Sequence, residues 1–107
     1  MTQAPIASTT IQSWFRIGHQ HPALPGHFPG SPVVPGVVLL DQVIAALIVA
    51  GMSADANTEW PQVKFQSPLL PGQLAALALN ITDQQARFEI TRGDERIALG
   101  NLRWSRA

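Results

Sequence analysis

The sequence predicts an α+β fold in which a curved antiparallel β-sheet is wrapped around one central buried helix. Three observations support this prediction: one long apolar segment with helix signals at both ends, five short runs with strand character, and turn residues between the later runs. The whole chain, residues 1–107, is expected to form a single domain, with residues 1–8 frayed.

The helix is expected over Val37–Met52, an apolar run that two polar residues interrupt. Pro35 and Gly36 precede the run and Gly51 lies near its end, which are typical start and stop signals. A membrane span needs roughly 20 apolar residues, so no span is expected here. Because a helix that is apolar on every side must be covered by protein, the sheet is expected to surround it.

Five runs that are rich in β-formers or alternate in polarity are expected to be strands. They are Thr10–Ile17, Glu59–Phe65, Gln73–Ile81, Gln84–Thr91 and Arg96–Trp104. Turn residues separate the later runs at Ser67-Pro68, Pro71-Gly72, Thr82-Asp83 and Gly93-Asp94. The last three runs are therefore predicted to form an antiparallel meander.

The composition excludes several classes of function. Seven basic residues balance seven acidic ones without a run of like charge, so neither nucleic acid nor an anionic membrane is an expected partner. The absence of cysteine excludes disulfides, thiolate metal sites and thiol nucleophiles. The first residues lack the features of a secretory signal, and a cytoplasmic location is expected. With 46% hydrophobic and 13% charged residues, the chain is expected to meet another chain through apolar surface.

Residues 18–36, GHQHPALPGHFPGSPVVPG, are dense in Pro and Gly and lead directly into the expected helix. Long loops of this kind are often functional. The residues from His27 to Asp41, HFPGSPVVPGVVLLD, resemble the β-hydroxyacyl-acyl carrier protein dehydratases of the FabA and FabZ types in identity and spacing. Weaker similarity through VKFQSPLLPGQLAALAL extends the resemblance over about residues 18–104.

This resemblance implies the hot-dog fold and a dehydratase that converts a 3-hydroxyacyl thioester into the trans-2-enoyl thioester, in fatty-acid or polyene-type lipid synthesis. Such a reaction needs a base, an acid and a group that stabilises the thioester oxygen. His27 is the predicted base, because a neutral imidazole titrates close to working pH. The structural alternative is a loop histidine that is hydrogen-bonded to the backbone.

Asp41 is the predicted acid, because burial in an otherwise apolar helix would oppose its ionisation. Gly36, at the helix entrance, is predicted to offer its backbone N–H to the thioester oxygen. The structural alternatives are an aspartate that accepts loop N–H groups and a glycine that is needed only for the turn.

Phe28 is expected to line the substrate pocket beside the base. Three- and four-residue spacings place a set of helix residues on one face, which is expected to border the acyl chain. The set is Val37, Asp41, Ile44, Ala45 and Ile48. The alternative is ordinary core, which is the favoured interpretation for Ile48. In the family a Gln commonly lies four residues after the acid, whereas this chain has Ala45, so the support of Asp41 differs.

The resemblance also implies an acyl carrier protein as partner and a homodimer, or higher oligomer, with active sites shared across the interface. Neither a cofactor nor a metal is expected. His19 and His21 could join His27 at a metal, but no nearby carboxylate or thiolate completes a usual site. Two alternatives stay open: a hot-dog thioesterase, and a non-catalytic hot-dog subunit that binds acyl chains or completes a heteromer.

Overall fold

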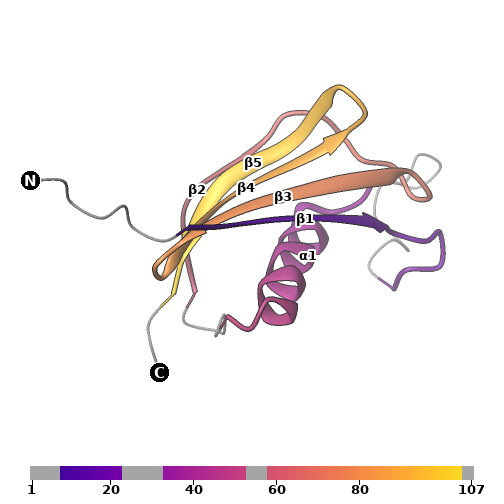
Figure 1. The fold of residues 1–107 in the computed structure, drawn as a ribbon. Coiled ribbons are helices and arrows are strands. Elements are labelled where there is room, and N and C mark those ends of the chain that lie inside the picture. The colour runs from indigo at the N-terminus through magenta and orange to yellow at the C-terminus, as the bar shows by residue number, and fades with distance from the viewer. Residues whose placement is uncertain (1–7, 23–32, 53–57, 105–107) are drawn as a thin grey trace, which may run out of the picture.

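The computed structural model describes residues 8–22, 33–52 and 58–104. The described elements, in chain order, are β1 (Ser8–Arg16), α1 (Gly36–Val49), β2 (Glu59–Phe65), β3 (Leu74–Thr82), β4 (Gln85–Arg92) and β5 (Glu95–Arg103). The strands form one antiparallel sheet in the order β1-β3-β4-β5-β2, and α1 lies across one face of it (Figure 1). The predicted α+β architecture is confirmed.

The predicted strands lie within two residues of the observed ones at every boundary. Helix α1 begins one residue earlier than expected and ends three residues earlier, at Val49. It ends there because Gly51 adopts a φ of 89°, which lets Met52 donate its N–H to the Leu47 carbonyl oxygen at 2.9 Å. Ser8 begins β1, so the fraying expected over residues 1–8 does not include it, and residues 1–7 lie outside the described residues.

The meander from β3 to β5 turns at the predicted places. The hairpin between β3 and β4 closes through Asp83 and Gln84, and Asp83 has a φ of 57°. The hairpin between β4 and β5 closes through Gly93 and Asp94, and Gly93 has a φ of 59°. Positive φ values suit two-residue loops, because their backbone twist matches that of the strands.

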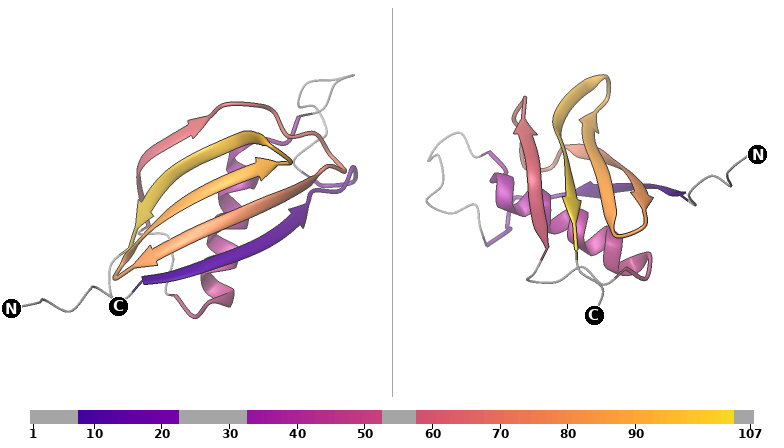
Figure 2. Two further views of the ribbon diagram at one scale, coloured as in Figure 1. Left: turned by 45° about the horizontal axis from the view of Figure 1, so that its top comes forward. Right: turned by 90° about the vertical axis from the view of Figure 1, so that its left-hand side faces the viewer.

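The core lies between the inner face of the sheet and one side of α1. The helix contributes Val38, Leu39, Val43 and Leu47, all of them buried. The three central strands contribute their own buried residues to this core: Ala75, Leu77, Leu79, Ile81, Ala86, Phe88, Ile90, Ile97, Ala98 and Leu102. Figure 2 shows the sheet curving over α1, with β1 and β2 at its two edges. Burying each large apolar side chain stabilises the fold by about 1.5–3 kcal/mol.

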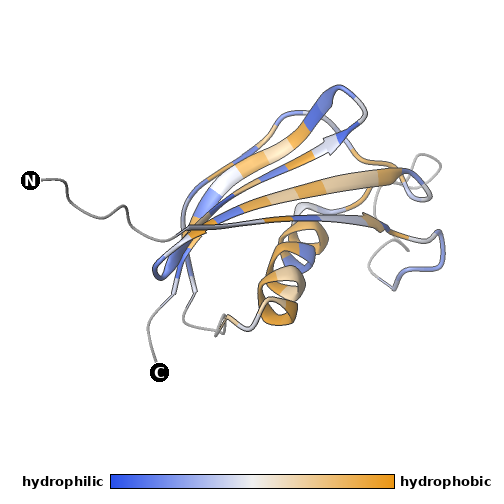
Figure 3. Cartoon of the chain, in the orientation of Figure 1, coloured by the Kyte–Doolittle hydropathy of each residue, from blue (hydrophilic) through white to orange (hydrophobic). Residues whose placement is uncertain are grey.

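The opposite side of α1 is open in the single chain. Val37, Ile48 and Val49 are 64%, 55% and 89% exposed. Figure 3 shows hydrophobic residues along most of α1, including the turns that face away from the sheet. The prediction of a helix buried on every side is therefore wrong for one chain, and so is the assignment of Ile48 to the core. The reason is geometric, because a five-stranded sheet curves over only one side of the helix.

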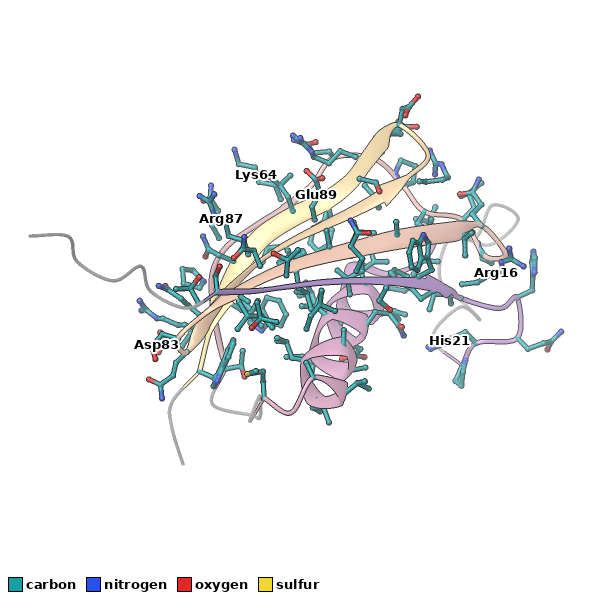
Figure 4. All side chains as sticks on the ribbon, viewed as in Figure 1. Arg16, His21, Lys64, Asp83, Arg87 and Glu89 are labelled. Carbon is teal, nitrogen blue, oxygen red and sulfur yellow. The ribbon has the colours of Figure 1, made fainter. Side chains whose placement is uncertain are left out.

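The outer face of the sheet carries charged side chains beside two exposed apolar ones, Trp14 and Leu74. Lys64, Arg87 and Glu89 project from it away from α1 (Figure 4). Glu89 pairs with Arg96 at 2.8 Å, as expected for a face that meets water. Helix α1 has 14 residues, and no helix in the described part of the chain is both long and apolar enough to span a bilayer.

Candidate functional site

The entrance of α1 is formed by a proline and a glycine. Pro35 is the N-cap residue, with φ −62° and ψ 147°, and its carbonyl oxygen accepts the N–H groups of Val38 and Leu39 at 3.0 and 3.4 Å. Gly36 is the first helical residue and is half-buried. By helix geometry, the N–H groups of Gly36 and Val37 have no acceptor within the helix. They lie at the positive end of the helix dipole.

The chain before this entrance is held by the connection between β2 and β3. Val34 donates its N–H to the Leu69 carbonyl oxygen at 2.8 Å, and both residues are buried. The Arg92 guanidinium, from the end of β4, donates to the Pro68 carbonyl oxygen at 2.7 Å and to Gln73 Oε1 at 2.9 Å. The helix entrance is therefore fixed to the sheet through two segments that are far apart in sequence.

Arg92 is itself fixed by Glu95, the first residue of β5. Arg92 Nη2 lies 2.6 Å from Glu95 Oε1, and Ser67 Oγ donates to Glu95 Oε2 at 2.8 Å. The hydrogen bond from Ser67, followed by the hydrogen bond and charge of Arg92, lowers the pKa of Glu95. This cluster lies at the surface and has a structural role toward the helix entrance.

Asp41 lies on the open side of α1 and is exposed in the single chain. Helix geometry places it about 7.5 Å along the axis from Gly36. Val37 and Ala45, four residues to either side, are also exposed. The expected burial of Asp41 is therefore absent from one chain, because the sheet covers the other side of the helix. What surrounds Asp41 is an apolar stripe that is open to solvent.

The other predicted site residues fall into two groups. Ile44 is half-buried and packs against the core, so it faces the sheet more than Ala45 does. His27 and Phe28 lie outside the described residues.

His19 lies beside Gly72, where an added β-carbon would come within 2.7 Å of His19 Cε1. Among residues 8–22, 33–52 and 58–104, no three His, Cys, Asp or Glu side chains group closely enough to hold a metal ion.

Two hollows border the helix. One, of about 390 Å³, lies at the entrance of α1 between residues 33–36, residues 65–69 and Leu39. Another, of about 190 Å³, lies between β1 and the side of α1 that carries Gln42 and Ala45. A hollow of about 490 Å³ lies on the outer face of the sheet and contains none of the motif residues. We therefore place the candidate site on the helix side, although the outer hollow is larger than the one at the helix entrance.

The sequence interpretation missed one residue at the helix entrance, Phe65. A β-carbon built at Gly36 would lie 2.7 Å from Phe65 Cζ and 3.0 Å from Cε1, so the aromatic ring lies directly against the glycine. Phe65 is the last residue of β2 and is 53% exposed. The only signal in the sequence was an aromatic residue at the end of a strand, which does not reveal a contact with the distant helix.

A curved five-stranded antiparallel sheet that holds one helix on its inner side is the hot-dog fold, which confirms the predicted fold class. The dehydratase heterocomplex ApeI:P from Xenorhabdus doucetiae is similar at a TM-score of 0.74 and 27% identity, over 98% of this chain and 93% of that chain. The fluoroacetyl-CoA thioesterase FlK shares the fold alone, with a TM-score of 0.64 and 11% identity over 94% of this chain and 86% of that one.

Curated relatives point to the same class. The 3-hydroxyacyl-[acyl-carrier-protein] dehydratase FabZ of Anaeromyxobacter is 30% identical over 94 residues, and that of Ehrlichia chaffeensis is 32% identical over 65 residues. These matches cover 78% and 56% of this chain, which spans 60% and 46% of the two relatives. The family model of the ApeI-like proteins, described as ApeI dehydratase, matches residues 3–101. The chain belongs to the ApeI-like dehydratase family.

Proposed function

We propose that this protein removes water from a 3-hydroxyacyl thioester, carried on acyl carrier protein, to give the trans-2-enoyl thioester. The observation that carries the proposal is the position of Asp41 relative to Gly36 on α1, in a chain that belongs to a dehydratase family. Asp41 and Gly36 lie on one helix, and helix geometry separates the two residues by about 7.5 Å along its axis. The aspartate side chain leans toward the helix N-terminus, which brings its carboxyl group closer to the Gly36 N–H.

Each group has one task in the proposed reaction. His27 takes the proton from C2, and the electrons of that C–H bond form the C2–C3 double bond. Asp41 donates a proton to the hydroxyl on C3, so the C3–O bond breaks and water leaves. The Gly36 N–H stabilises negative charge on the thioester oxygen while C2 loses its proton. The sum is loss of one water, with the thioester kept.

Proton transfer from a carboxyl group to a substrate hydroxyl is favoured where bulk water is kept away from both groups. Asp41 is exposed in one chain and lies in an apolar stripe with Val37 and Ile48. A second copy that covers this stripe would exclude water from Asp41 and from the substrate hydroxyl. The proposal therefore includes a homodimer in which His27 of one subunit and Asp41 of the other act on the same substrate.

Within that dimer, Val37 and Ala45 border the acyl chain from the open side of α1. Phe28 lies next to His27 in sequence and would line the same space. Ile44 supports this surface from below, because its side chain packs partly against the core. Apolar lining with few polar groups is what an acyl chain requires.

Mass spectrometry tests the proposal directly. Purified protein is incubated with 3-hydroxyacyl-acyl carrier proteins of graded acyl-chain length, and the mass of each acylated carrier protein is measured. The expected result is loss of one water with the thioester intact. Release of the free acid would instead identify a thioesterase, and unchanged substrate at every length would identify a non-catalytic subunit. Either of those results would reject the proposal.

A further inference from the structure

The backbone that carries Phe65 is fixed in place. Phe65 pairs with Ala98 of β5 in the sheet register. Directly after it, Gln66 and Ser67 both donate their N–H groups to the Ile97 carbonyl oxygen, at 2.8 and 3.3 Å. The strand end therefore cannot swing away without losing these bonds, and the aromatic side chain is aimed at the entrance of α1.

The contact depends on the absence of a side chain at Gly36. All three nearest atoms to a β-carbon built there belong to the Phe65 ring, at 2.7, 3.0 and 3.1 Å. A real β-carbon essentially never lies within 3.0 Å of another heavy atom, so any larger residue at position 36 would displace the ring. Because Gly36 has no side chain, the Phe65 ring can lie against the backbone of this first helical residue.

The ring is a wall of a hollow and is not part of the core. It borders the hollow of about 390 Å³ at the helix entrance and remains 53% exposed. The opposite walls are the backbone of residues 33–36 and the connection after β2, which Val34 and Leu69 tie together at 2.8 Å. A ligand group that reaches the Gly36 N–H therefore meets the ring beside it.

From these contacts we infer that Phe65 determines specificity at the thioester end of the substrate. This inference rests on the proposed function, in which the thioester oxygen accepts a hydrogen bond from the Gly36 N–H. When the thioester oxygen is bound at the Gly36 N–H, C2 of the substrate lies beside the Phe65 ring. The ring then leaves room for an unbranched C2 and excludes substrates that carry a methyl group on C2.

The main test compares unbranched 3-hydroxyacyl thioesters with their 2-methyl counterparts, using the wild type, Phe65→Leu and Phe65→Ala. In the wild type, kcat/KM should favour the unbranched substrate. Because one methyl group in an apolar pocket changes kcat/KM by about tenfold or more, Phe65→Ala should reduce this preference about tenfold, and Phe65→Leu less. Leu70→Ala is the matched control, since Leu70 is 42% exposed on the same connection and does not line the hollow. An unchanged ratio in both Phe65 variants overturns the inference.

A binding experiment distinguishes a failure of this inference from a failure of the proposed function. Pantetheine amide analogues, in which nitrogen replaces the thioester sulfur, are titrated with and without the 2-methyl group, and the ratio of their Kd values is followed. If the wild type dehydrates nothing, the proposed function fails, yet a Kd ratio that falls in Phe65→Ala still supports the role of Phe65. Equal ratios in wild type and variant, or no binding of either analogue, overturn it.

A double-mutant comparison tests the contact itself. In the wild type, Gly36→Ala should change the Tm less favourably than in a Phe65→Ala background, because its β-carbon must displace the ring. In a Phe65→Ala background the same substitution should leave the Tm unchanged or raise it, since alanine is a better helix residue than glycine. Equal Tm changes in the two backgrounds would show that the ring does not lie against Gly36, and would overturn the inference without any activity measurement.

Discussion

Val34 donates its backbone N–H to the carbonyl oxygen of Leu69 at 2.8 Å, and this bond joins the chain that enters α1 to the connection between β2 and β3. The same connection is held on its other side by Arg92, which donates to the carbonyl oxygen of Pro68. The position of the helix entrance, and hence of Gly36, is therefore set by a residue of β4 that no catalytic motif contains.

Replacing this arginine should loosen the entrance. Arg92→Leu removes hydrogen bonds from a charged, half-buried group, so we expect the free energy of unfolding to fall by about 1–3 kcal/mol. Denaturant unfolding measures this. The control is Arg87→Leu, because Arg87 lies on the outer face and makes no ion pair among the described residues. Its effect should stay within about 0.5 kcal/mol. Equal losses in the two variants would contradict a special role for Arg92.

The carboxyl group of Glu95 should titrate below its ordinary pKa of 4.5, chiefly through the Ser67 hydrogen bond and then through Arg92. Since the folded chain binds a proton at Glu95 less readily than the unfolded chain, this group stabilises the fold above pH 4.5. That contribution is lost as the pH falls through the lowered pKa. Ser67→Ala should move the pKa back toward 4.5 in an NMR titration of the Glu95 carboxyl carbon. Ser13→Ala on β1 is the control, and an unshifted pKa in Ser67→Ala would refute the assigned cause.

Loss of either proposed proton-transfer group should abolish most activity. His27→Ala and Asp41→Asn are each expected to reduce kcat/KM by about 10²–10⁴-fold, the usual contribution of a general acid or base. Circular dichroism checks that the fold is kept. Asp94→Asn, in the turn between β4 and β5, is the matched carboxylate control and should retain activity. If Asp41→Asn keeps near-normal turnover, Asp41 is a structural residue.

A mixed dimer tests whether the sites are shared. When His27→Ala and Asp41→Asn chains are refolded together at equal amounts, half of the dimers contain one chain of each kind. A shared arrangement gives such a dimer one site with both groups intact, so activity should recover to about a quarter of wild type. Subunit exchange is verified separately by mass spectrometry with isotope-labelled chains. No recovery despite exchange would mean that both groups act within one chain.

The open stripe on α1 should be the surface that meets a second copy. Light scattering is expected to give twice the chain mass of 11.5 kDa. Val49→Asp places a charge on a side chain that is 89% exposed in the single chain, and burial of that charge should weaken the dimer by about 100-fold or more. Gln12→Asp puts the same charge on the outer face of β1 and should leave the dimer intact. A wild-type monomer at micromolar concentration would end the shared-site proposal.

Much of the fold was predictable from local patterns. The turn residues around Asp83 and Gly93 need positive φ values in two-residue hairpin loops, and few sequences supply them, so the meander could be placed closely. The run from Val37 to Met52 is too long and too apolar to be anything but a core helix or a span. The motif from His27 to Asp41 identified the family, and the match to residues 3–101 confirmed it.

Local periodicity, turn geometry and motif spacing were enough to predict which segments fold into which elements and which residue types could carry the chemistry. The tertiary structure alone decided which sides of those elements meet. Hydropathy could not reveal that α1 is covered on one side only, leaving Asp41 exposed and Ile48 outside the core. Nor could it reveal that Phe65 lies against Gly36, because that contact arises from the curvature of the sheet and the close packing that a missing side chain permits.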